Sequence, residues 1–250
     1  MLHRWFILEL KSINLTMKPN ERILVALDTT DKKRAKKLIT GLNGHIGGVK
    51  IGKEFFTANG PQGVRYVLSE GQPFFLDLKF HDIPNTVIGA LRSAMKLKPS
   101  IVNVHASGGA AMLRAAAQTV SELGLSRPLL IAVTILTSLE DTDMADIGFS
   151  SIITDQVLRL AKLAQKCGLD GVVCSPHEIK AIRDACGSDF KLIVPGIRPG
   201  WATHGDQRRI TTPRQAIDRG ADYIVIGRPI TDHDKPVDAA KRIVEELSVV

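Results

Sequence analysis

The sequence predicts a single α/β domain in which eight parallel strands and their connecting helices close into a (β/α)8 TIM barrel. From Arg22 onward, short runs rich in Val, Ile and Leu alternate with longer stretches of helical period, which is typical of parallel strands joined by crossover helices. Eight such strands suit a closed barrel better than an open doubly wound sheet, which usually has about five or six. The length of 250 residues also fits one barrel.

Each predicted strand is a short apolar run, and no antiparallel hairpin signal separates consecutive runs. The eight predicted strands are residues 22–28, 46–52, 73–79, 101–107, 129–136, 171–176, 191–197 and 223–230.

The stretches between these strands carry apolar residues three and four positions apart, the spacing of a helix with one buried face. Several end at a glycine, as helix C-termini prefer. The clearest predicted helices are residues 31–42, 86–97, 110–124, 154–168 and 238–247. The longest connection, residues 137–151, is polar and acidic; it is interpreted either as a functional lid or as a surface loop with a short helix.

The first 21 residues are interpreted as an N-terminal appendage, and residues 22–250 as the barrel. The apolar run near the start is broken by Glu9 and Lys11, and no small-residue cleavage site follows, so a signal peptide is not expected. The sequence leaves open whether translation starts at Met1 or at Met17.

Composition favours a folded protein with an anionic partner. The 33 Lys and Arg against 26 Asp and Glu give a formal charge of +7, which suits nucleic acid or a small phosphorylated ligand. Nucleic-acid binding is disfavoured because aromatic residues make up only 5% and no recognised module or basic stripe occurs. The densest basic stretch, residues 31–37, is interpreted as a solvated helix face.

The cysteines and apolar runs indicate a cytoplasmic protein with no membrane span. Cys167, Cys174 and Cys186 form neither an even set nor a C-x-x-C pair, so they are interpreted as core thiols. The longest apolar runs are far shorter than the roughly 20 residues of a membrane helix.

Charged residues gather at the carboxyl-terminal strand ends, where barrels of this fold place their active sites. Asp77 and Lys79 end one apolar run, and side chains two apart on a strand share a face, with Cα atoms roughly 6 to 7 Å apart. Any single pair could be a structural ion pair. Together with Asp28 and Lys50, however, four charged residues converge at the same end of the barrel. Burying a charge is costly unless it has a partner or a function. The other polar residues near strand ends are His105, Ser107, Thr137, Ser138, Arg198 and Arg228.

Two turns predict a phosphate site. Residues 195–200, "PGIRPG", and 226–230, "IGRPI", place Arg198 and Arg228 beside glycines after the last two strands, where barrels often bind phosphate. Glycine lets backbone amides approach the ligand, and arginine supplies a charge-assisted donor. No metal site is expected, because His81 and His105 have no further His or Cys at ligand spacing and are better explained by packing or hydrogen bonding.

These motifs together resemble the orotidine 5′-monophosphate decarboxylase family in its bacterial form. The most specific is "DLKFHDIPNT" at residues 77–86, and the resemblance extends over nearly the whole chain from about Arg22. It implies cofactor-free decarboxylation of orotidine 5′-monophosphate to uridine 5′-monophosphate, the last step of de novo pyrimidine nucleotide biosynthesis. The supporting stretches are, in order, "VALD", "KIGKEFF", "VNVHASGG", "AVTILTS", "GLDGVVCS", "PGIRP", "GDQRRI" and "IGRPI".

The resemblance also implies roles for individual residues. Lys79 would donate a proton to C6 as carbon dioxide leaves, Asp77 would lie beside the departing carboxylate, and Lys50 would hold Asp77. Asp82 and Thr86 would reach the active site of a second subunit, so the resemblance implies a homodimer. The expected substrate contacts are Asp28, Lys50, Asp77, Thr86, Thr137 or Ser138, Arg198, Gln207, Gly227 and Arg228.

A rival prediction comes from the wider group that shares this barrel and motif, metal-dependent sugar-phosphate decarboxylases and aldol-type synthases. Those relatives place a metal-binding carboxylate at the end of the second strand. This chain has Lys50 there, and a cation would repel a divalent metal.

Overall fold

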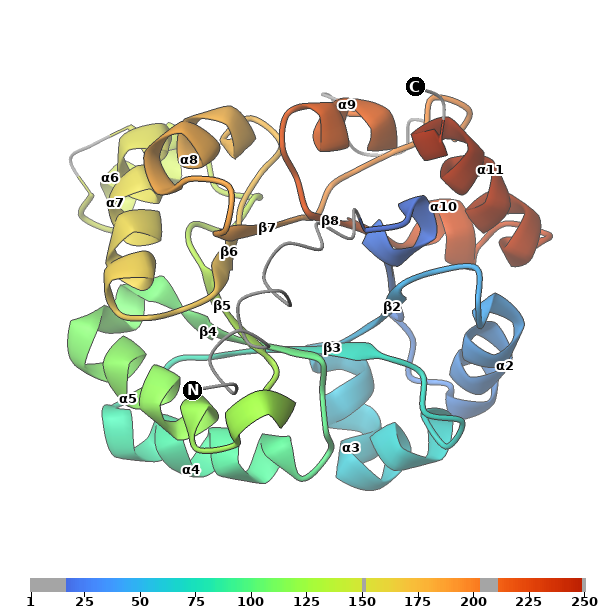
Figure 1. Ribbon diagram of the computed structural model, residues 1–250, viewed down its shortest axis with the longest axis horizontal. Helices are drawn as coiled ribbons and strands as arrows, with labels where there is room; N and C mark the ends of the chain where they lie inside the picture. The colour runs from blue at the N-terminus through green and yellow to red at the C-terminus, as the bar shows by residue number, and fades with distance from the viewer. Residues whose placement is uncertain (1–16, 150–151, 203–210, 249–250) are drawn as a thin grey trace, which may run out of the picture.

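The computed structural model describes residues 17–149, 152–202 and 211–248, and their eight strands form a closed parallel barrel. Consecutive strands pair with one another, and β8 pairs back to β1, so the described barrel closes (Figure 1). The predicted fold class is therefore confirmed. The strands are β1 Ile23–Ala26, β2 Gly48–Gly52, β3 Phe74–Phe80, β4 Ile101–His105, β5 Leu129–Val133, β6 Gly171–Val173, β7 Lys191–Val194 and β8 Tyr223–Ile226.

Helices surround the ring of strands, and each long one buries an apolar face against it (Figure 1). The α-helices are α2 Lys32–Leu42, α3 Lys53–Val67, α4 Pro84–Met95, α5 Gly109–Ser121, α6 Asp141–Asp146, α7 Ile153–Lys166, α8 Ile179–Cys186, α9 Pro213–Asp218, α10 Arg228–Thr231 and α11 Pro236–Ser248. The 3-10 helices are η1 Pro19–Arg22, η2 Ala106–Gly108 and η3 Gly124–Ser126.

The predicted strand 223–230 is wrong beyond Ile226, because the chain turns there into the short helix α10. Pro229 explains the difference: proline has no N–H for a strand ladder, but it is favourable in the first turn of a helix. The predicted strands corresponding to β1, β4, β5, β6 and β7 also ran two or three residues too far. Their apolar character continues into the loops that cover the barrel end.

The core has two parts, as a barrel requires. Seven buried residues from β1, β3, β4, β5, β7 and β8 fill the barrel interior, and the larger cluster lies between strands and helices. All three cysteines are free and buried, as the sequence predicted. Burial raises the pKa of the Cys174 thiol well above its usual value. The interior residues are Leu24, Ala26, Phe75, Ile101, Ile131, Ile193 and Val225.

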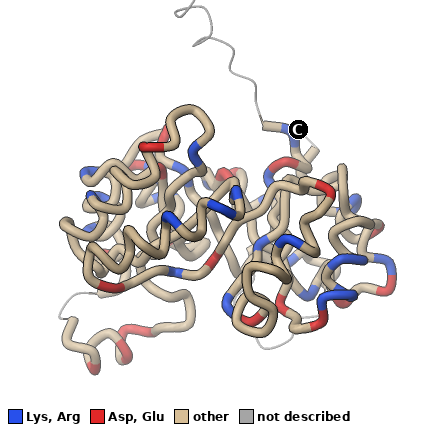
Figure 2. The backbone as a smooth tube through the Cα atoms, turned by 90° about the horizontal axis from the view of Figure 1, so that it is seen from below, with Lys and Arg blue, Asp and Glu red and all other residues tan. Residues whose placement is uncertain are grey.

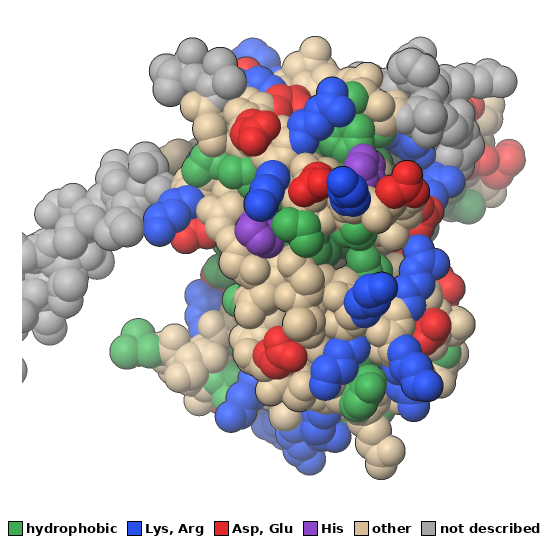
Figure 3. Space-filling model, turned by 90° about the vertical axis from the view of Figure 1, so that its right-hand side faces the viewer, with side chains coloured by type: hydrophobic (Ala, Val, Ile, Leu, Met, Phe, Trp, Pro, Cys, Tyr) green, Lys and Arg blue, Asp and Glu red, His purple; other side chains and the backbone are tan. Residues whose placement is uncertain are grey.

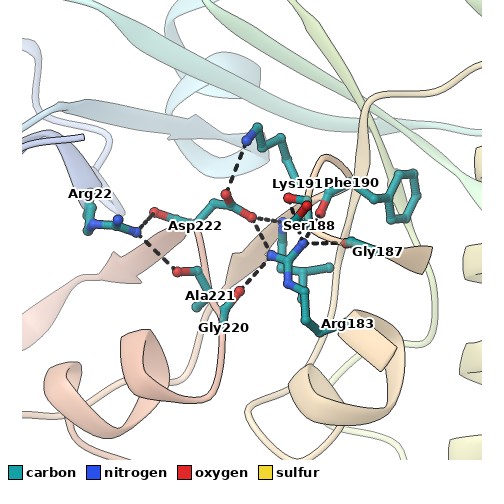
Figure 4. A network of polar contacts seen from close by, with 10 residues as sticks. Arg22, Arg183, Gly187, Ser188, Phe190, Lys191, Gly220, Ala221 and Asp222 are labelled. Carbon is teal, nitrogen blue, oxygen red and sulfur yellow. Dashed lines mark hydrogen bonds and ion pairs between the residues drawn. The ribbon is translucent and has the colours of Figure 1, made fainter. Parts of the chain in front are cut away.

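A polar network joins elements at the amino-terminal end of the barrel, opposite the strand ends that carry the charged residues (Figure 4). Arg183 of α8 donates through Nη2 to Asp222 Oδ2 at 2.7 Å and to the Gly220 carbonyl at 2.6 Å. Its Nη1 donates to three further carbonyls, those of Gly187, Ser188 and Phe190. Asp222 in turn accepts from the backbone N–H of Leu192, so the network connects α8, β7 and the start of β8.

Basic residues on the surface stand among acidic ones. The basic stretch on α2 faces outward while Ala35 and Leu38 face the core, and Arg34 pairs with Asp232 at 2.7 Å. Figures 2 and 3 show Lys and Arg dispersed between Asp and Glu on the faces they display. None of the described helices combines the length and apolar character needed to cross a bilayer.

The predicted N-terminal appendage, residues 1–21, falls mostly outside the described residues, so its boundary stays a prediction. The long loop at 137–151 contains the short helix α6, and in Figure 2 its acidic segment stands away from the barrel.

Candidate active site

The centre of the site is an irregular stretch at the end of β3. The ladder between β3 and β4 pairs Leu76 with Val102 and then Phe80 with Val104, so the three residues between them on β3 lie opposite Asn103 alone. This is a β-bulge, and Lys79 within it has a positive φ of 55°. Left-handed backbone at a residue other than glycine is uncommon and costs of order 1 kcal/mol or more.

Four charged side chains form a chain of contacts across β1, β2 and β3. Asp77 Oδ1 lies 2.6 Å from Lys79 Nζ, and Asp77 Oδ2 lies 3.2 Å from Lys50 Nζ. Asp28 Oδ1 is 3.6 Å from Lys50 Nζ. The side chain of Asp77 is 9% exposed and that of Asp28 is 62% exposed, so the chain runs from the barrel interior toward solvent. The structure thus brings these four residues together as their positions at the strand ends indicated.

The environment keeps Asp77 ionised. Burial raises the pKa of its carboxyl, but the charges of Lys50 and Lys79 and hydrogen bonds from Lys79 and Asn103 outweigh burial, and the net pKa lies below the usual 3.8. Gly52 leaves room for this arrangement, because a Cβ there would lie 3.1 Å from Lys50 Nζ. A buried carboxylate therefore stands between two ammonium groups at neutral pH.

Sequence reasoning missed Asn103, which is fully buried on β4. Its Nδ2 donates to Asp77 Oδ1 at 2.7 Å, and its Oδ1 accepts from the backbone N–H of Lys79 at 2.8 Å. The available signal was a single polar residue inside the apolar run "IVNVH". A lone asparagine in a strand does not reveal which neighbour it binds.

His105 ends β4 beside His81, with ring centroids 5.5 Å apart. Burial, together with the electrostatic effects of His81, Lys53 and Lys79, lowers the pKa of His105 to about 4. The ring is therefore neutral at pH 7. Within the described residues, no group of three or more His, Cys, Asp or Glu side chains is arranged to hold a metal ion.

The two predicted phosphate-binding turns come before and after α9 along the chain. Gly227 precedes α10 and faces the first strand, since a Cβ there would lie 3.8 Å from Asp28 Oδ2. Arg228 follows it and is exposed. Arg198 is 7% exposed, and its backbone N–H donates to the Thr211 carbonyl at 3.1 Å. Gln207 lies outside the described residues.

A cavity of about 1040 Å³ opens at the same end of the barrel, over the loops that follow β5, β6 and β7. Thr137, one of the two proposed pyrimidine contacts, lines it; Ser138 is exposed on the same loop. The cavity is not lined by the four charged side chains, which lie at the ends of β1, β2 and β3. The carboxyl-terminal end of the barrel therefore has two parts. The charged side chains lie at the ends of β1, β2 and β3, and the cavity lies over the loops after β5, β6 and β7.

Asp82 lies just before α4, and Thr86 lies in the first turn of that helix. Both are exposed at the start of α4, and Asp82 Oδ1 accepts from the backbone N–H of Ile83 at 2.6 Å. Ile83, between Asp82 and Pro84, is 67% exposed.

Comparison with known proteins connects this chain with one family. The family model described as "Orotidine 5'-phosphate decarboxylase / HUMPS family" matches residues 21–243. An orotidine 5′-phosphate decarboxylase from Paramagnetospirillum magneticum is 50% identical over 91% of this chain and 98% of its own length. The enzyme of that name from Moorella thermoacetica is 48% identical over 94% and 96% of the two chains.

Solved structures agree with the sequence comparisons. The crystal structure of orotidine 5′-phosphate decarboxylase from Lactobacillus acidophilus matches with a TM-score of 0.80 and 37% identity. The match covers 91% of this chain and 99% of that one.

Proposed function

The chain belongs to the orotidine 5′-phosphate decarboxylase / HUMPS family, and we propose that Lys79, Asp77 and Lys50 carry out its decarboxylation chemistry. The enzyme converts orotidine 5′-phosphate to uridine 5′-phosphate and carbon dioxide, the last step of pyrimidine nucleotide biosynthesis. The single observation that carries the assignment of residues is the buried carboxylate of Asp77 held between two ammonium groups.

Lys79 is the proton donor in this proposal. When the bond between C6 and the carboxylate breaks, carbon dioxide leaves and an electron pair remains on C6. The Lys79 ammonium group stabilises that pair and transfers a proton to it, which gives uridine 5′-phosphate. A preorganised charge in a site that excludes water stabilises such a developing anion more strongly than water does.

Asp77 lies beside the departing carboxylate and Lys50 holds it there. Repulsion between two carboxylates favours loss of one as neutral carbon dioxide, but strain of this kind typically supplies only ~1 to 5 kcal/mol. Enzymes lower barriers by roughly 8 to 23 kcal/mol, so Lys79 must contribute more than strain does. Asp28 and Lys50 are the proposed contacts for the ribose hydroxyls.

Binding of the phosphate far from C6 orders the reacting groups. Arg228, Gly227 and Gln207 are the proposed phosphate contacts, with Arg198 in the same region and Thr137 or Ser138 at the pyrimidine edge. Interactions with remote groups can be used to close loops and align the reacting atoms, so they affect turnover as well as affinity.

A homodimer completes the proposed site. Asp82 and Thr86 are exposed beside the exposed Ile83, which suits a surface that faces a second subunit. In that arrangement the partner's Asp82 carboxylate approaches Lys79 and helps to hold its ammonium group.

Mixing two inactive variants tests this sharing. Asp82→Ala and Lys79→Ala are each expected to be inactive, but subunit exchange yields mixed dimers in which one site has both residues. If half of the dimers are mixed and one of their two sites is intact, activity returns to about one quarter of the wild-type level. No recovery after exchange, with mixed dimers demonstrated by mass, would place Asp82 in its own subunit's site.

The assignment of the chemistry itself is tested by following loss of orotidine 5′-phosphate absorbance in excess EDTA, with Lys79→Ala alongside. Conversion that is unaffected by EDTA and disappears in Lys79→Ala supports lysine-dependent catalysis without a metal. Activity abolished by EDTA would instead favour the metal-dependent sugar-phosphate enzymes that share this barrel.

A further inference from the structure

We propose that Asn103 is a positioning residue for catalysis, because its single amide holds both the backbone of Lys79 and the carboxylate of Asp77. This inference rests on the proposed function of those two residues. It adds a residue on a fourth strand to the proposed chemistry.

The bulge in β3 makes such a residue necessary. Asp77, Leu78 and Lys79 lie opposite Asn103 alone, so the regular backbone ladder is interrupted there. Asn103 Oδ1 accepts the Lys79 N–H at 2.8 Å and thereby replaces a backbone carbonyl. A buried N–H left unpaired would cost free energy, and Lys79 already has the uncommon φ of 55°. The side chain of Asn103 therefore helps to retain a backbone conformation that is otherwise unfavourable.

The orientation of the amide follows from its partners. A backbone N–H can only donate, so the oxygen of Asn103 must face Lys79. The ionised carboxylate of Asp77 can only accept, so the amide nitrogen must face Asp77 at 2.7 Å. Asn103 is fully buried, which means that water does not compete for either bond. The amide of Asn103 offers both a donor and an acceptor on one planar group.

The consequence for catalysis is geometric. Asp77 Oδ1 accepts from both Lys79 Nζ and Asn103 Nδ2, so the same oxygen is fixed from two sides. Asn103 holds Lys79 at its backbone and Asp77 at its carboxylate, and so fixes the separation of the proposed proton donor and its neighbouring anion. A misplacement of about 1 Å in such a pair can reduce turnover on the order of 100-fold.

The substitution Asn103→Asp removes one of the two hydrogen bonds and keeps the other. Aspartate still accepts from the Lys79 N–H, but it places a second carboxylate against Asp77. Two carboxylates in contact share a proton and titrate at a raised apparent pKa, even with Lys50 and Lys79 beside them. At about pH 8 we expect kcat to fall on the order of 10- to 100-fold with a smaller change in KM. As the pH is lowered toward about 5, the protonated carboxyl regains the donor, and kcat relative to wild type should rise.

Wild-type protein measured in parallel accounts for the titration of His105 on β4, whose pKa is coupled to the charge of Asp77. The matched control is Thr134→Val. Thr134 is also a buried polar residue, on the chain just after β5, and its hydroxyl donates to the Val173 carbonyl at 3.0 Å. Thr134→Val should alter stability, but the ratio of its kcat to that of wild type should not change with pH. The proposal would be overturned if the ratio of kcat for Asn103→Asp to kcat for wild type were constant with pH. It would also be overturned if the two kcat values were equal.

Thermal unfolding supplies a readout that does not depend on activity. Asn103→Asp should lower the melting temperature, and adding Asp77→Asn should recover part of the loss at about pH 8, since an amide then again faces a carboxylate. If the second substitution lowers the melting temperature further, the two side chains are not coupled as proposed. Wild-type protein that fails to decarboxylate orotidine 5′-phosphate would refute the proposed function instead, and would leave this unfolding test intact.

Discussion

Arg183 is predicted to stabilise the amino-terminal end of the barrel, and Arg183→Met tests this. The guanidinium of Arg183 donates to four backbone carbonyls and to Asp222, and its side chain is 20% exposed while that of Asp222 is 14% exposed. Methionine retains most of the apolar contact of the side chain but none of the donors.

The expected magnitude follows from these contacts. Removing one partner of a buried ion pair typically costs about 3 to 5 kcal/mol. Arg183 is partly exposed, and Asp222 keeps Lys191 at 3.3 Å and the Leu192 N–H, so we expect the free energy of unfolding to fall by about 2 to 4 kcal/mol. For a domain of this size each kcal/mol shifts the melting temperature by about 2 to 4 °C.

Urea unfolding followed by circular dichroism measures the change in the free energy of unfolding. The control is Lys180→Met on the same helix, because Lys180 pairs with Asp184 while their side chains are 80% and 64% exposed. Exposed pairs of this kind contribute about 0 to 1 kcal/mol. Because Arg183 lies at the end of the barrel away from the site, kcat of the folded variant should equal that of wild type. A loss below about 1 kcal/mol for Arg183→Met, no larger than the control, would refute this reasoning.

Three further predictions concern the site and the barrel. Because the pKa of His105 is lowered from 6.5 to about 4, the unfolded chain binds more protons between these values, and stability should fall as the pH drops from 6.5 to 4. Allowing for its partial exposure, the loss is about 1 to 2 kcal/mol; it should shrink in His105→Gln, and an unchanged pH dependence in urea unfolding would contradict it. Arg228→Ala should lower both kcat and kcat/KM in steady-state assays, and an unchanged kcat would contradict the use of phosphate binding for turnover. Gly171→Ala should destabilise the barrel by about 1 to 3 kcal/mol, because a Cβ on β6 would collide with the Lys191 carbonyl, whereas Gly41→Ala in α2 has space and should not; equal unfolding midpoints would contradict this.

The sequence by itself determined the fold class and the end of the barrel where the four charged side chains lie. Alternation of apolar runs with helical periodicity depends on local spacing, which a chain displays directly. Because parallel strands end at one edge, Asp28, Lys50 and Asp77 could be placed together without coordinates. The predicted end of β8 was wrong, since the apolar run at 223–230 continues past Ile226 and only Pro229 signals the change to a helix.

Only the tertiary structure decided how the charged residues are held. The bulge in β3, the left-handed backbone of Lys79 and the two bonds of Asn103 depend on the register between β3 and β4. That register arises from pairing between segments about 25 residues apart, and no local pattern specifies it. Ideal alternation predicted that Asp77 and Lys79 share a face. The contact at 2.6 Å is instead made within a strand that departs from ideal geometry, and a buried side chain from the neighbouring strand supports that departure.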